Sequence, residues 1–568
     1  MGSLTSSMFR AAGFLGGRLM LSRFERNAQR GITSNRKTLM TILEANSETE
    51  FGVAHRFEGL ARDPTGHAFR QAVPLSRYSN HVEAIDRMER GETGVLTADD
   101  LLFFAVSSGT TGRPKLVPTT KKHHGFTFKY MGTVVQGVIS RHLHPSWSTD
   151  RGVDLMTFSG DQKYASGGTP IGGATAEAVR RMARIVPHLW NSPIEVYTLD
   201  HQPSAWYLHA LYGLHNARNQ FVEAVFAPHL LEWLRSIESR WDELLTDVEH
   251  GTLTADLQIE DSLRERVITD NPGNPSRAEE LRAATRDGFD SFIPRIWPHM
   301  THVMTITSGS FAMYLPKLRR YVGELPIYSP SYGATESFIG VALWPDRPHR
   351  YVMATDPSYF EFIPAELVHE DRPPTVDMEA VEVGRQYELV ITNHAGLYRY
   401  RLGDVVTVVD RLGETPVIEF VHRVGTQFDL AGEKTTEDQV AVAVGELARN
   451  VSMEISDYTT AEDVEASPAR YVIYLESEHP TAMSIDQMAQ VFDEEMQKAN
   501  PVTSGFRTNG LLGRPRLAIV APGTFTRLRD VIAGSDLPPA TSQLKIPRRL
   551  TNPDHRELLE GAVVVASS

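Results

Sequence analysis

The chain has 568 residues, no cysteine and a net charge of -14, with 41% apolar and 23% charged residues, which is typical of a globular protein of several domains. The acidic balance argues against a nucleic-acid partner, and no apolar run reaches the roughly 18 residues that span a bilayer, so we expect no membrane partner. Without cysteine there is no disulfide, thiolate metal site or cysteine nucleophile, which fits a reducing compartment, and we expect the cytoplasm.

The N-terminal 36 residues contain several arginines and serines but one acid, Glu25, as organellar transit peptides do. Apolar residues at helical spacing favour a different interpretation, a helix on the first domain that continues into a second helix. The residues that carry this spacing are Leu15, Leu19, Met20 and Phe24, followed by Leu39, Ile42 and Leu43.

Apolar runs then alternate with amphipathic stretches, which is the pattern of an α/β protein with largely parallel sheets. The predicted strands are 101–106, 303–306, 387–392, 405–409 and 417–421. The region 203–288, which includes "FVEAVFAPHLLEWLRSIESRWDELL", is predicted to be helical throughout.

A polar, glycine-bearing stretch after Arg423 is predicted to be a hinge. Beyond it lie a strand at 470–477, a helix capped by Ser484 and a strand at 517–520. The predicted helix buries Ile485, Met488, Val491 and Phe492. We therefore predict a large α/β domain over 1–423 and a smaller, mobile α+β domain over 424–568, with a reaction site in the cleft between them.

The loop "SSGTTGRPK", from Ser107 to Lys115, directly follows the first predicted strand. Its glycines let backbone N–H groups approach an anion, its hydroxyls add donors, and Lys115 adds charge. A flexible serine-glycine turn would need neither the lysine nor the buried strand, so the context favours a phosphate cradle, although not the P-loop pattern.

Two further stretches carry chemistry. In "SPSYGATES", Tyr332 can stack on a flat ring, Thr335 can contact a phosphate and Glu336 can bind Mg²⁺. In "GLYRYRLGDVV", Asp404 is predicted to lie in a turn before a strand, where a carboxylate can accept hydrogen bonds from a ribose diol. Taken alone, an exposed turn aspartate is the simpler interpretation of Asp404.

Other stretches favour structural roles. His123, His124 and the histidines of "RHLH" lack a companion ligand set, and we interpret them as solvated helix-surface residues. Trp297, Met304 and Met313 are predicted to lie in the core.

The order of these features resembles the adenylate-forming superfamily, with "SSGTTGRPK", "YGATE" and "RLGD" at the places of its phosphate loop, fifth motif and ribose-binding aspartate. From about Arg23 to the C-terminus the chain is similar to the Gretchen Hagen 3 family of acyl acid amido synthetases, most specifically in "AGLYRYRLGDV". That family usually has Ser-Ser-Gly-Thr-Ser-Gly-Gly and Tyr-Ala-Ser-Ser-Glu, and "SSGTTGR" and "YGATE" are closer to the general superfamily form.

The resemblance implies ATP and Mg²⁺ as cofactors and assigns the nucleotide-binding residues. Those that would line the triphosphate are Ser107, Ser108, Gly109, Thr110 and Thr111. Those that would wall the adenine are Ser308, Gly309, Tyr332, Gly333 and Ala334. Thr335 and Glu336 would address the phosphates and the metal, and Asp404 the ribose.

The resemblance also assigns residues to the predicted hinge and small domain. Arg423 would mark the hinge and reach the ribose or a phosphate. Lys434 and Lys545 would neutralise charge on the α-phosphate and the carboxylate, and with Glu336 they form the predicted catalytic set.

The implied function is that of an ATP-dependent ligase that activates a carboxylic acid as an acyl-adenylate and transfers the acyl group to an amine. We expect the amine to be an amino acid and the protein to be a monomer or a weak oligomer. An acyl-CoA ligase with the same first step, and a nucleotide-binding protein without catalysis, are the alternatives. The joint presence of Glu336, Asp404, Lys434 and Lys545 argues against the second.

Overall fold

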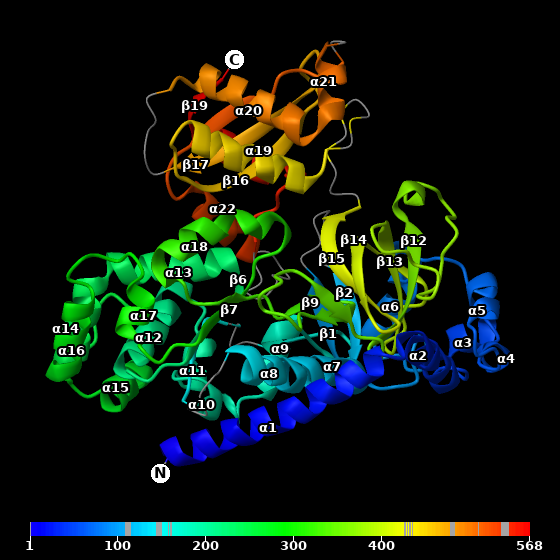
Figure 1. The fold of residues 1–568 in the computed structure, drawn as a ribbon, viewed down its shortest axis with the longest axis horizontal. Helices are drawn as coiled ribbons and strands as arrows, with labels where there is room; N and C mark the ends of the chain where they lie inside the picture. Colours follow the sequence, from blue (N-terminus) through cyan, green and yellow to red (C-terminus); the bar gives the residue numbers. More distant parts are fainter. Residues whose placement is uncertain are drawn as a thin grey trace.

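The computed structural model shows a broad body with a smaller unit above it, and the two termini on opposite sides (Figure 1). The structure describes residues 2–107, 115–143, 150–156, 158, 162–424, 428, 430, 433, 435–477, 483–508, 511–534 and 545–567. The predicted site residues Ser108, Gly109, Thr110, Thr111 and Lys434 lie outside these ranges.

Two long helices open the chain, α1 (Gly2–Ala28) and α2 (Gly31–Ala45), so the helical interpretation of this segment is confirmed. Helix α2 buries the predicted Leu39, Ile42 and Leu43. The predicted face of α1 is partly wrong, because Phe14 and Leu21 are buried whereas Leu15 and Leu19 are exposed. At Gly17, α1 crosses Gly137 so closely that a Cβ atom would meet its backbone.

Short helices lead from α2 to the first sheet. They are α3 (Glu50–Ala54), α4 (Phe57–Leu60), α5 (His67–Ala72), the 3-10 turn η1 (Tyr78–Asn80) and α6 (Val82–Glu89). The first sheet has the order β2-β1-β5-β4. Its strands are β1 (Leu101–Ser107), β2 (Lys115–Thr120), β4 (Lys163–Tyr164) and β5 (Pro170–Gly172). The predicted strand at 101–106 is thus confirmed, and the glycine-rich stretch at 167–173 contributes β5 beside β1.

After β2 the chain forms one continuous helical segment. Its parts are α7 (Lys121–Lys129), the π-helical η2 (Tyr130–Val134), α8 (Val135–Val138) and the π-helical η3 (Ile139–Leu143). The interpretation of His123 and His124 as solvated residues is wrong, since both are buried on the inner side of α7. Burial lowers the pKa of His123 to about 4 and keeps the ring neutral.

A parallel sheet with the order β3-β6-β7-β8 forms the centre of the helical lobe. Its strands are β3 (Val153–Asp154), β6 (Phe221–Phe226), β7 (His302–Ile306) and β8 (Ile327–Tyr328). The prediction that 203–288 is helical throughout is therefore wrong at β6, where pairing with β3 and β7 on both sides overrides the helical pattern that follows.

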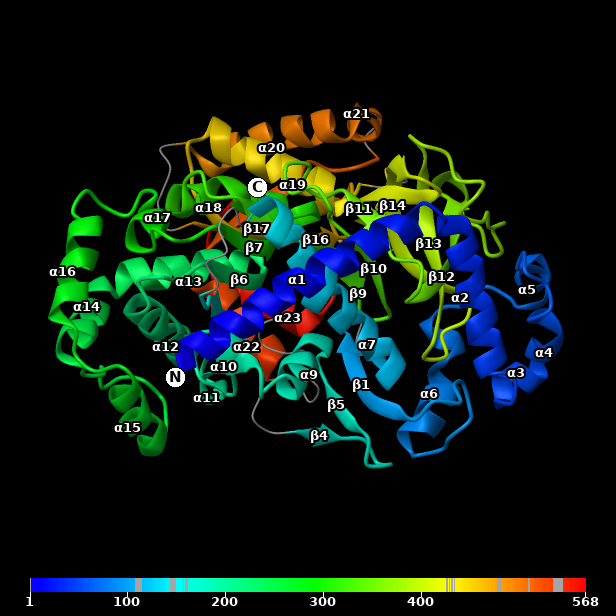
Figure 2. The same ribbon diagram turned by 60° about the horizontal axis from the view of Figure 1, so that its bottom comes forward.

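Helices surround this parallel sheet (Figure 2). They are α9 (Ala174–Arg181), α10 (Val186–Leu189), α11 (Ile194–Tyr197), α12 (Gln202–His215), α13 (Ala227–Ser239), α14 (Trp241–His250), α15 (Asp261–Asp270), α16 (Pro275–Ala284), α17 (Phe292–Ile296), the 3-10 turn η4 (Gly309–Tyr314) and α18 (Leu315–Val322). Trp297 and Met304 lie in the core as predicted, and the side chain of Met313 is outside the described set.

The largest sheet has seven strands in the order β12-β13-β14-β15-β11-β10-β9. They are β9 (Ser331–Ala334), β10 (Ser337–Val341), β11 (Tyr351–Met353), β12 (Ser358–Pro364), β13 (Gln386–Asn393), β14 (Tyr400–Leu412) and β15 (Thr415–Arg423), with η5 (Ala365–Leu367) after β12. All its pairs are antiparallel, so the expectation of largely parallel sheets is wrong here. The α/β fold class, with mixed and parallel sheets, is confirmed.

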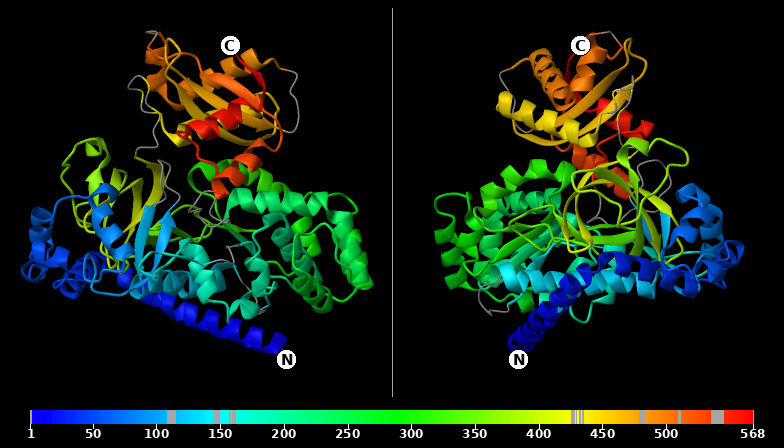
Figure 3. Two further views of the ribbon diagram at one scale, coloured as in Figure 1. Left: turned by 180° about the vertical axis from the view of Figure 1, so that it is seen from behind. Right: turned by 45° about the vertical axis from the view of Figure 1, so that its right-hand side comes forward.

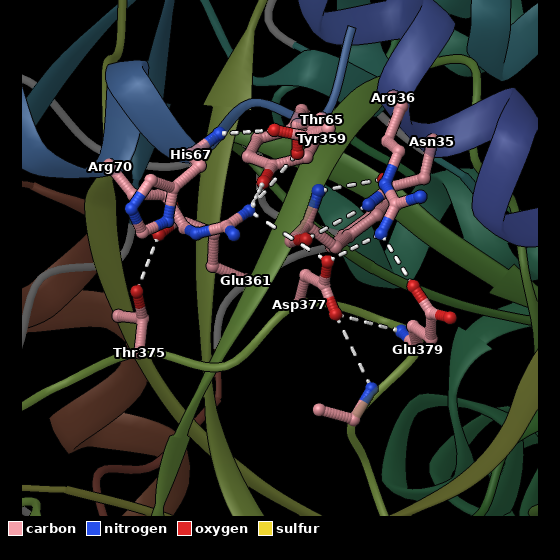
Figure 4. Close-up of polar contacts among 12 residues, drawn as sticks. Asn35, Arg36, Thr65, His67, Arg70, Tyr359, Glu361, Thr375, Asp377 and Glu379 are labelled. Carbon is pink, nitrogen blue, oxygen red and sulfur yellow. Dashed lines mark hydrogen bonds and ion pairs between the residues drawn. The ribbon is translucent and has the colours of Figure 1, made fainter.

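Polar contacts join the N-terminal helices to this sheet (Figure 4). Asn35 exchanges two hydrogen bonds with the backbone of Phe360, at 3.0 and 2.9 Å. Arg36 forms ion pairs with Asp377 at 2.8 Å and Glu379 at 2.7 Å. These contacts link residues more than 300 positions apart.

The C-terminal unit has its own sheet, in the order β16-β17-β18-β19, and its own apolar core. Its elements are α19 (Glu437–Asn450), β16 (Ile455–Asp463), β17 (Arg470–Ser477), α20 (Ile485–Ala499), α21 (Pro501–Thr508), β18 (Arg516–Val520), α22 (Thr524–Ala533), α23 (Pro553–Glu560) and β19 (Val563–Ala566). Both predicted strands and the Ser484 cap are confirmed. Met488 and Phe492 are fully buried, and Ile485 and Val491 partly.

The C-terminal unit sits on the helical lobe, next to α18 and α13 (Figure 3). Arg529 forms a bidentate ion pair with Glu232 at 2.7 and 2.8 Å. Tyr314 donates a hydrogen bond to Asp457 at 3.0 Å and accepts one from Arg548 at 3.0 Å. That the domain boundary lies at residue 423, and that the small unit moves, remain predictions.

Candidate active site

A carboxylate on β14, a guanidinium on β15 and a phenol on β9 contact one another. Tyr332 of β9 donates a hydrogen bond to Asp404 Oδ2 at 2.7 Å, and Arg423 Nε lies 3.3 Å from Asp404 Oδ1. Asp404 and Arg423 are direct partners across β14 and β15. Asp404 is buried, and each of its carboxylate oxygens lies beside a donor. Such a carboxylate can also accept hydrogen bonds from the hydroxyl groups of a ligand.

The predicted position of Asp404 needs a correction. It lies inside β14 and not in a turn before a strand. The preceding Gly403 has a φ of 84°, a conformation that glycine adopts without a steric penalty, so the glycine that suggested a turn is an irregularity within the strand.

An aromatic and glycine-bearing wall lies beside this carboxylate. The ring of the half-buried Tyr332 is 5.8 Å from those of Tyr351 and Phe420. Gly309 follows β7 with a φ of 60°, and a Cβ atom there would lie 3.4 Å from Phe420. The predicted Ser308 and Gly309 thus lie on the same side of the site as Tyr332 and Phe420. A surface of this kind can bind a flat ring.

Glu336 lies at the end of the β9–β10 turn, after Gly333, Ala334 and Thr335. It is buried, and its Oε1 accepts a hydrogen bond from Tyr400 at 3.2 Å. Its backbone carbonyl accepts from Asn393 at 2.8 Å, which fixes the turn.

Among the residues that the structure describes, none donates a hydrogen bond to the second carboxylate oxygen of Glu336. One carboxylate suffices for Mg²⁺ that keeps waters and phosphate oxygens, so the residue fits the predicted role. Among the described residues, no group of three or more histidines and acids forms a separate metal cluster.

The phosphate loop connects two paired strands. Ser107 ends β1, and Lys115 begins β2 directly opposite it. The loop residues between them are outside the described ranges. Burial lowers the pKa of Lys115, while the Glu336 carboxylate opposes this effect and Arg423 and Arg77 add to it. The lysine therefore faces the same cluster of charges as Glu336 and Arg423.

The small unit contributes Lys545 near this site. Its ammonium lies 5.9 Å from the centre of the Phe311 ring in η4, and the side chain keeps access to solvent. Desolvation by nearby protein atoms lowers the pKa of Lys545, and the carboxylates of Glu437 and Asp404 oppose this shift. Lys434, the other predicted lysine, lies outside the described ranges.

The arginines of "YRYRLGD" have structural partners. The buried Arg399 pairs with Glu361 at 2.8 Å and donates to Thr375 and to the carbonyls of Arg70 and Val73. Arg401 pairs with the buried Glu388. Because their donors are engaged, these arginines hold the strand in place and leave Tyr400 and Asp404 for the site.

Two residues of the site escaped the sequence analysis. Tyr400, which contacts Glu336, has the same parity as Asp404, and the period-two pattern of a strand would have placed both on the face opposite the arginines. Tyr78 contacts the backbone of Leu116 at the end of the phosphate loop. No sequence signal marks that contact, because Tyr78 lies before the first strand.

Comparison with known families decides the relationship. Models of the GH3 family match the N-terminal domain at residues 20–327, the central domain at 351–423 and the C-terminal domain at 438–554. The chain belongs to the GH3 family. The predicted resemblance is thereby confirmed.

Curated GH3 relatives match over nearly the whole chain. The jasmonoyl–L-amino acid synthetase JAR4 of Nicotiana attenuata is 30% identical, over 93% of this chain and 93% of its own length. The indole-3-acetic acid-amido synthetase GH3.10 of Arabidopsis thaliana is also 30% identical, over 95% and 96%.

Solved structures agree with the GH3 relationship. The acyl acid amido synthetase GH3.15 superposes with a TM-score of 0.83 at 25% identity, covering 97% of both chains. A 2-hydroxyisobutyryl-CoA ligase in the postadenylation state shares the fold alone, with a TM-score of 0.53 at 10% identity over 93% and 91%. Of the helices that the structure describes, none combines the length and apolar character needed to traverse a bilayer.

Proposed function

We propose that this GH3 chain joins a carboxylic acid to an amino acid in two steps. The acid carboxylate attacks the α-phosphorus of ATP, forming an acyl-adenylate and releasing pyrophosphate. The amine then attacks the acyl carbon, forming an amide and releasing AMP and a proton. The chain is thus an acid–amino acid ligase of the adenylate-forming class. The contact of Asp404 with Tyr332 and Arg423 carries this proposal, because a buried carboxylate beside an aromatic ring is suited to accept hydrogen bonds from the ribose hydroxyls.

The nucleotide would bind between the seven-stranded sheet and the phosphate loop. Asp404 would accept from the ribose hydroxyls, and the ring of Tyr332 would pack on the adenine. Lys115 and the loop after Ser107 would hold the phosphates. A positive charge held beside the α-phosphate stabilises the charge that develops as the carboxylate attacks, and Lys545 is the small unit's candidate for this task.

Glu336 would hold Mg²⁺ through its unengaged oxygen, and the metal when bound would neutralise phosphate charge. Tyr400 orients this carboxylate by its hydrogen bond.

The small unit would move between the two steps. Adenylation needs charge at the α-phosphate, whereas the second step needs room for the amine, and one rigid arrangement serves both poorly. We assign the first step to the docked arrangement of Figure 1, in which Arg529 of the small unit pairs with Glu232 of the large body.

A panel of carboxylic acids tests the function. Each acid is incubated with ATP, Mg²⁺ and labelled pyrophosphate, and label in ATP reports adenylation. Acids that exchange are then incubated with the amino acids or with CoA, and mass spectrometry identifies the product.

Jasmonate and indole-3-acetate should be in the panel, because the two curated relatives described above are named as synthetases of amino acid conjugates of these acids. We expect exchange with at least one acid, and an amide with one or more amino acids. Exchange followed by thioester and no amide would assign an acyl-CoA ligase instead.

A further inference from the structure

A phenol outside every recognised motif holds the strand that leaves the phosphate loop. The hydroxyl of Tyr78, in η1, accepts a hydrogen bond from the N–H of Leu116 at 2.9 Å and donates one to the carbonyl of the same residue at 3.2 Å. A single side-chain atom thus satisfies both backbone groups of one residue in β2.

These bonds matter because β2 lies at the edge of its sheet. Among the strands that the structure describes, the order β2-β1-β5-β4 gives it a neighbour on one side only, where Leu116 lies opposite Val106. An edge strand presents unpaired N–H and C=O groups on its free side, and nothing in the sheet itself prevents that strand from fraying. Tyr78 occupies the place of a second neighbouring strand at this one position.

The same side chain also supports the lysine at the end of the loop. The Lys115 ammonium lies 5.4 Å from the centre of the Tyr78 ring, close enough for attraction to the ring face. Tyr78 therefore restrains two consecutive residues, Lys115 through its ring and Leu116 through its hydroxyl.

The two strands that flank the phosphate loop are held differently. Strand β1 has strand neighbours on both sides, β2 along its length and β5 at Phe104 and Ala105. Lys115 belongs to the edge strand, and its pKa responds to Glu336 and Arg423 across the site. Misplacement of the start of β2 would therefore move the Lys115 ammonium relative to Glu336.

We propose that Tyr78 is a positioning residue for ATP, which sets the start of β2 and the direction of Lys115. This inference rests on the function proposed above, since it assumes that Lys115 binds the triphosphate. The phenol does not touch the nucleotide and acts through Leu116 and Lys115. Its removal should impair ATP use and leave the binding of the carboxylic acid unchanged, because positioned charges contribute only when their geometry is kept.

Two variants separate the contributions of hydroxyl and ring. Tyr78→Phe removes both hydrogen bonds to Leu116 and keeps the ring, and we expect kcat/KM for ATP in pyrophosphate exchange to fall about 10-fold. Tyr78→Leu removes both restraints, and we expect a fall of about 100-fold. The KM for the carboxylic acid should stay within about twofold of the wild-type value in both variants, since uniform loss of structure would raise it too.

Tyr359→Phe is the matched control. Tyr359 is a buried tyrosine of the large body, whereas Tyr78 is half-buried, and the Tyr359 hydroxyl accepts a hydrogen bond from Arg70 at 2.8 Å, away from the loop (Figure 4). This variant should lower the Tm and leave the KM for ATP unchanged. An equal effect of Tyr359→Phe and Tyr78→Phe on ATP kinetics would overturn the proposal, because it would reduce the role of Tyr78 to general stability.

Two measurements do not depend on turnover. Hydrogen exchange followed by mass spectrometry should show lost protection in the peptide that contains Leu116 in Tyr78→Phe and normal protection in β1. Calorimetry with ATP and Mg²⁺ should show weaker binding by Tyr78→Phe than by the wild type. If these results hold while no acid supports exchange, the positioning role stands and the proposed function fails. Unchanged protection of Leu116 together with unchanged ATP affinity would overturn the positioning role.

Discussion

Replacing Tyr314 with phenylalanine is expected to loosen the small unit from the large body without damaging either. Tyr314 lies in η4, and its hydroxyl donates to Asp457 and accepts from Arg548, each at 3.0 Å. Asp457 and Arg548 both belong to the small unit and pair with one another at 2.5 Å, so their ion pair survives the change. The substitution removes cross-unit hydrogen bonds only.

The size of the effect follows from these contacts. Hydrogen bonds to charged groups contribute about 1.5–3 kcal/mol each, and undocking returns part of this by hydrating Asp457 and Arg548, so we expect a net loss of about 2–3 kcal/mol. That corresponds to a shift of roughly 30- to 150-fold in the ratio of docked to undocked molecules. The Arg529–Glu232 and Arg235–Glu454 ion pairs still favour docking, so the variant should populate both states.

The absence of native cysteine makes the assay direct. Cysteines at the exposed positions Ser276 of α16 and Gln490 of α20 can carry a donor and an acceptor dye, and energy transfer reports the docked fraction. Tyr314→Phe should lower that fraction and slow pyrophosphate exchange, while the reaction of preformed acyl-adenylate with the amine should be unchanged or faster.

The matched control is Tyr321→Phe. Tyr321 is equally buried, and its hydroxyl donates to Glu238 at 2.5 Å, entirely within the large body. It should lower stability without changing energy transfer. If Tyr314→Phe leaves both energy transfer and the balance of the two half-reactions unchanged, the docked arrangement does not govern the first step.

Three further outcomes are expected. Asp404→Asn should raise the KM for ATP in exchange assays roughly 10- to 100-fold, since unpaired ribose hydroxyls cost about 1–3 kcal/mol, and an unchanged KM would contradict ribose binding. Glu336→Gln should lower exchange by about 100-fold or more, and full exchange would rule out its electrostatic role. Burial lowers the pKa of His209 to about 3, so the wild type should lose about 2 kcal/mol more unfolding free energy than His209→Gln between pH 7 and pH 5 in urea titrations. Parallel pH dependence of the two proteins would show that His209 is not buried in its neutral form.

The direction of the pH dependence expected for His209 follows from proton uptake by the unfolded chain. The unfolded histidine binds a proton below about pH 6.5, whereas the folded one stays neutral down to about pH 3. Its contribution to stability is therefore present above pH 6.5 and lost as the pH falls through this window. The buried ring contacts Ser192 at 2.8 Å, which glutamine can replace without introducing a charge.

Local sequence patterns correctly predicted those helices and strands whose formation depends on neighbouring residues. Strand β1 and helix α20 were predicted correctly, because a β-rich run and a Ser484 cap are complete within a few residues. Phe221–Phe226 was missed, because its strand character depends on β3 and β7, which lie far away in sequence. Similarly, the spacing of apolar residues in α1 predicted a helix but not which of its two apolar faces is buried. Packing against residues far away in the sequence buries the face with Phe14 and Leu21.

The candidate site shows the same division. Tyr332, Glu336 and Asp404 could be proposed as site residues because each stands in a phrase whose residue types suit one ligand. Whether the strands of their sheet are parallel or antiparallel could not be predicted, since both arrangements are built from the same apolar runs. Tyr78 was beyond the reach of motif reasoning, because its importance arises only once β2 is found to be an edge strand.

The contacts between α2 and the seven-stranded sheet have a consequence for synthesis of the protein. Asn35 bonds to Phe360, and Leu39, Ile42 and Leu43 pack against Tyr359. About 320 residues must be made between these partners, which takes roughly 15–60 s at the usual rate of translation. The sheet itself is built from strands that follow one another closely, so its own pairing is fast by comparison. The first helices to leave the ribosome therefore wait longest for their partners, and their apolar faces are the surfaces that a chaperone would meet.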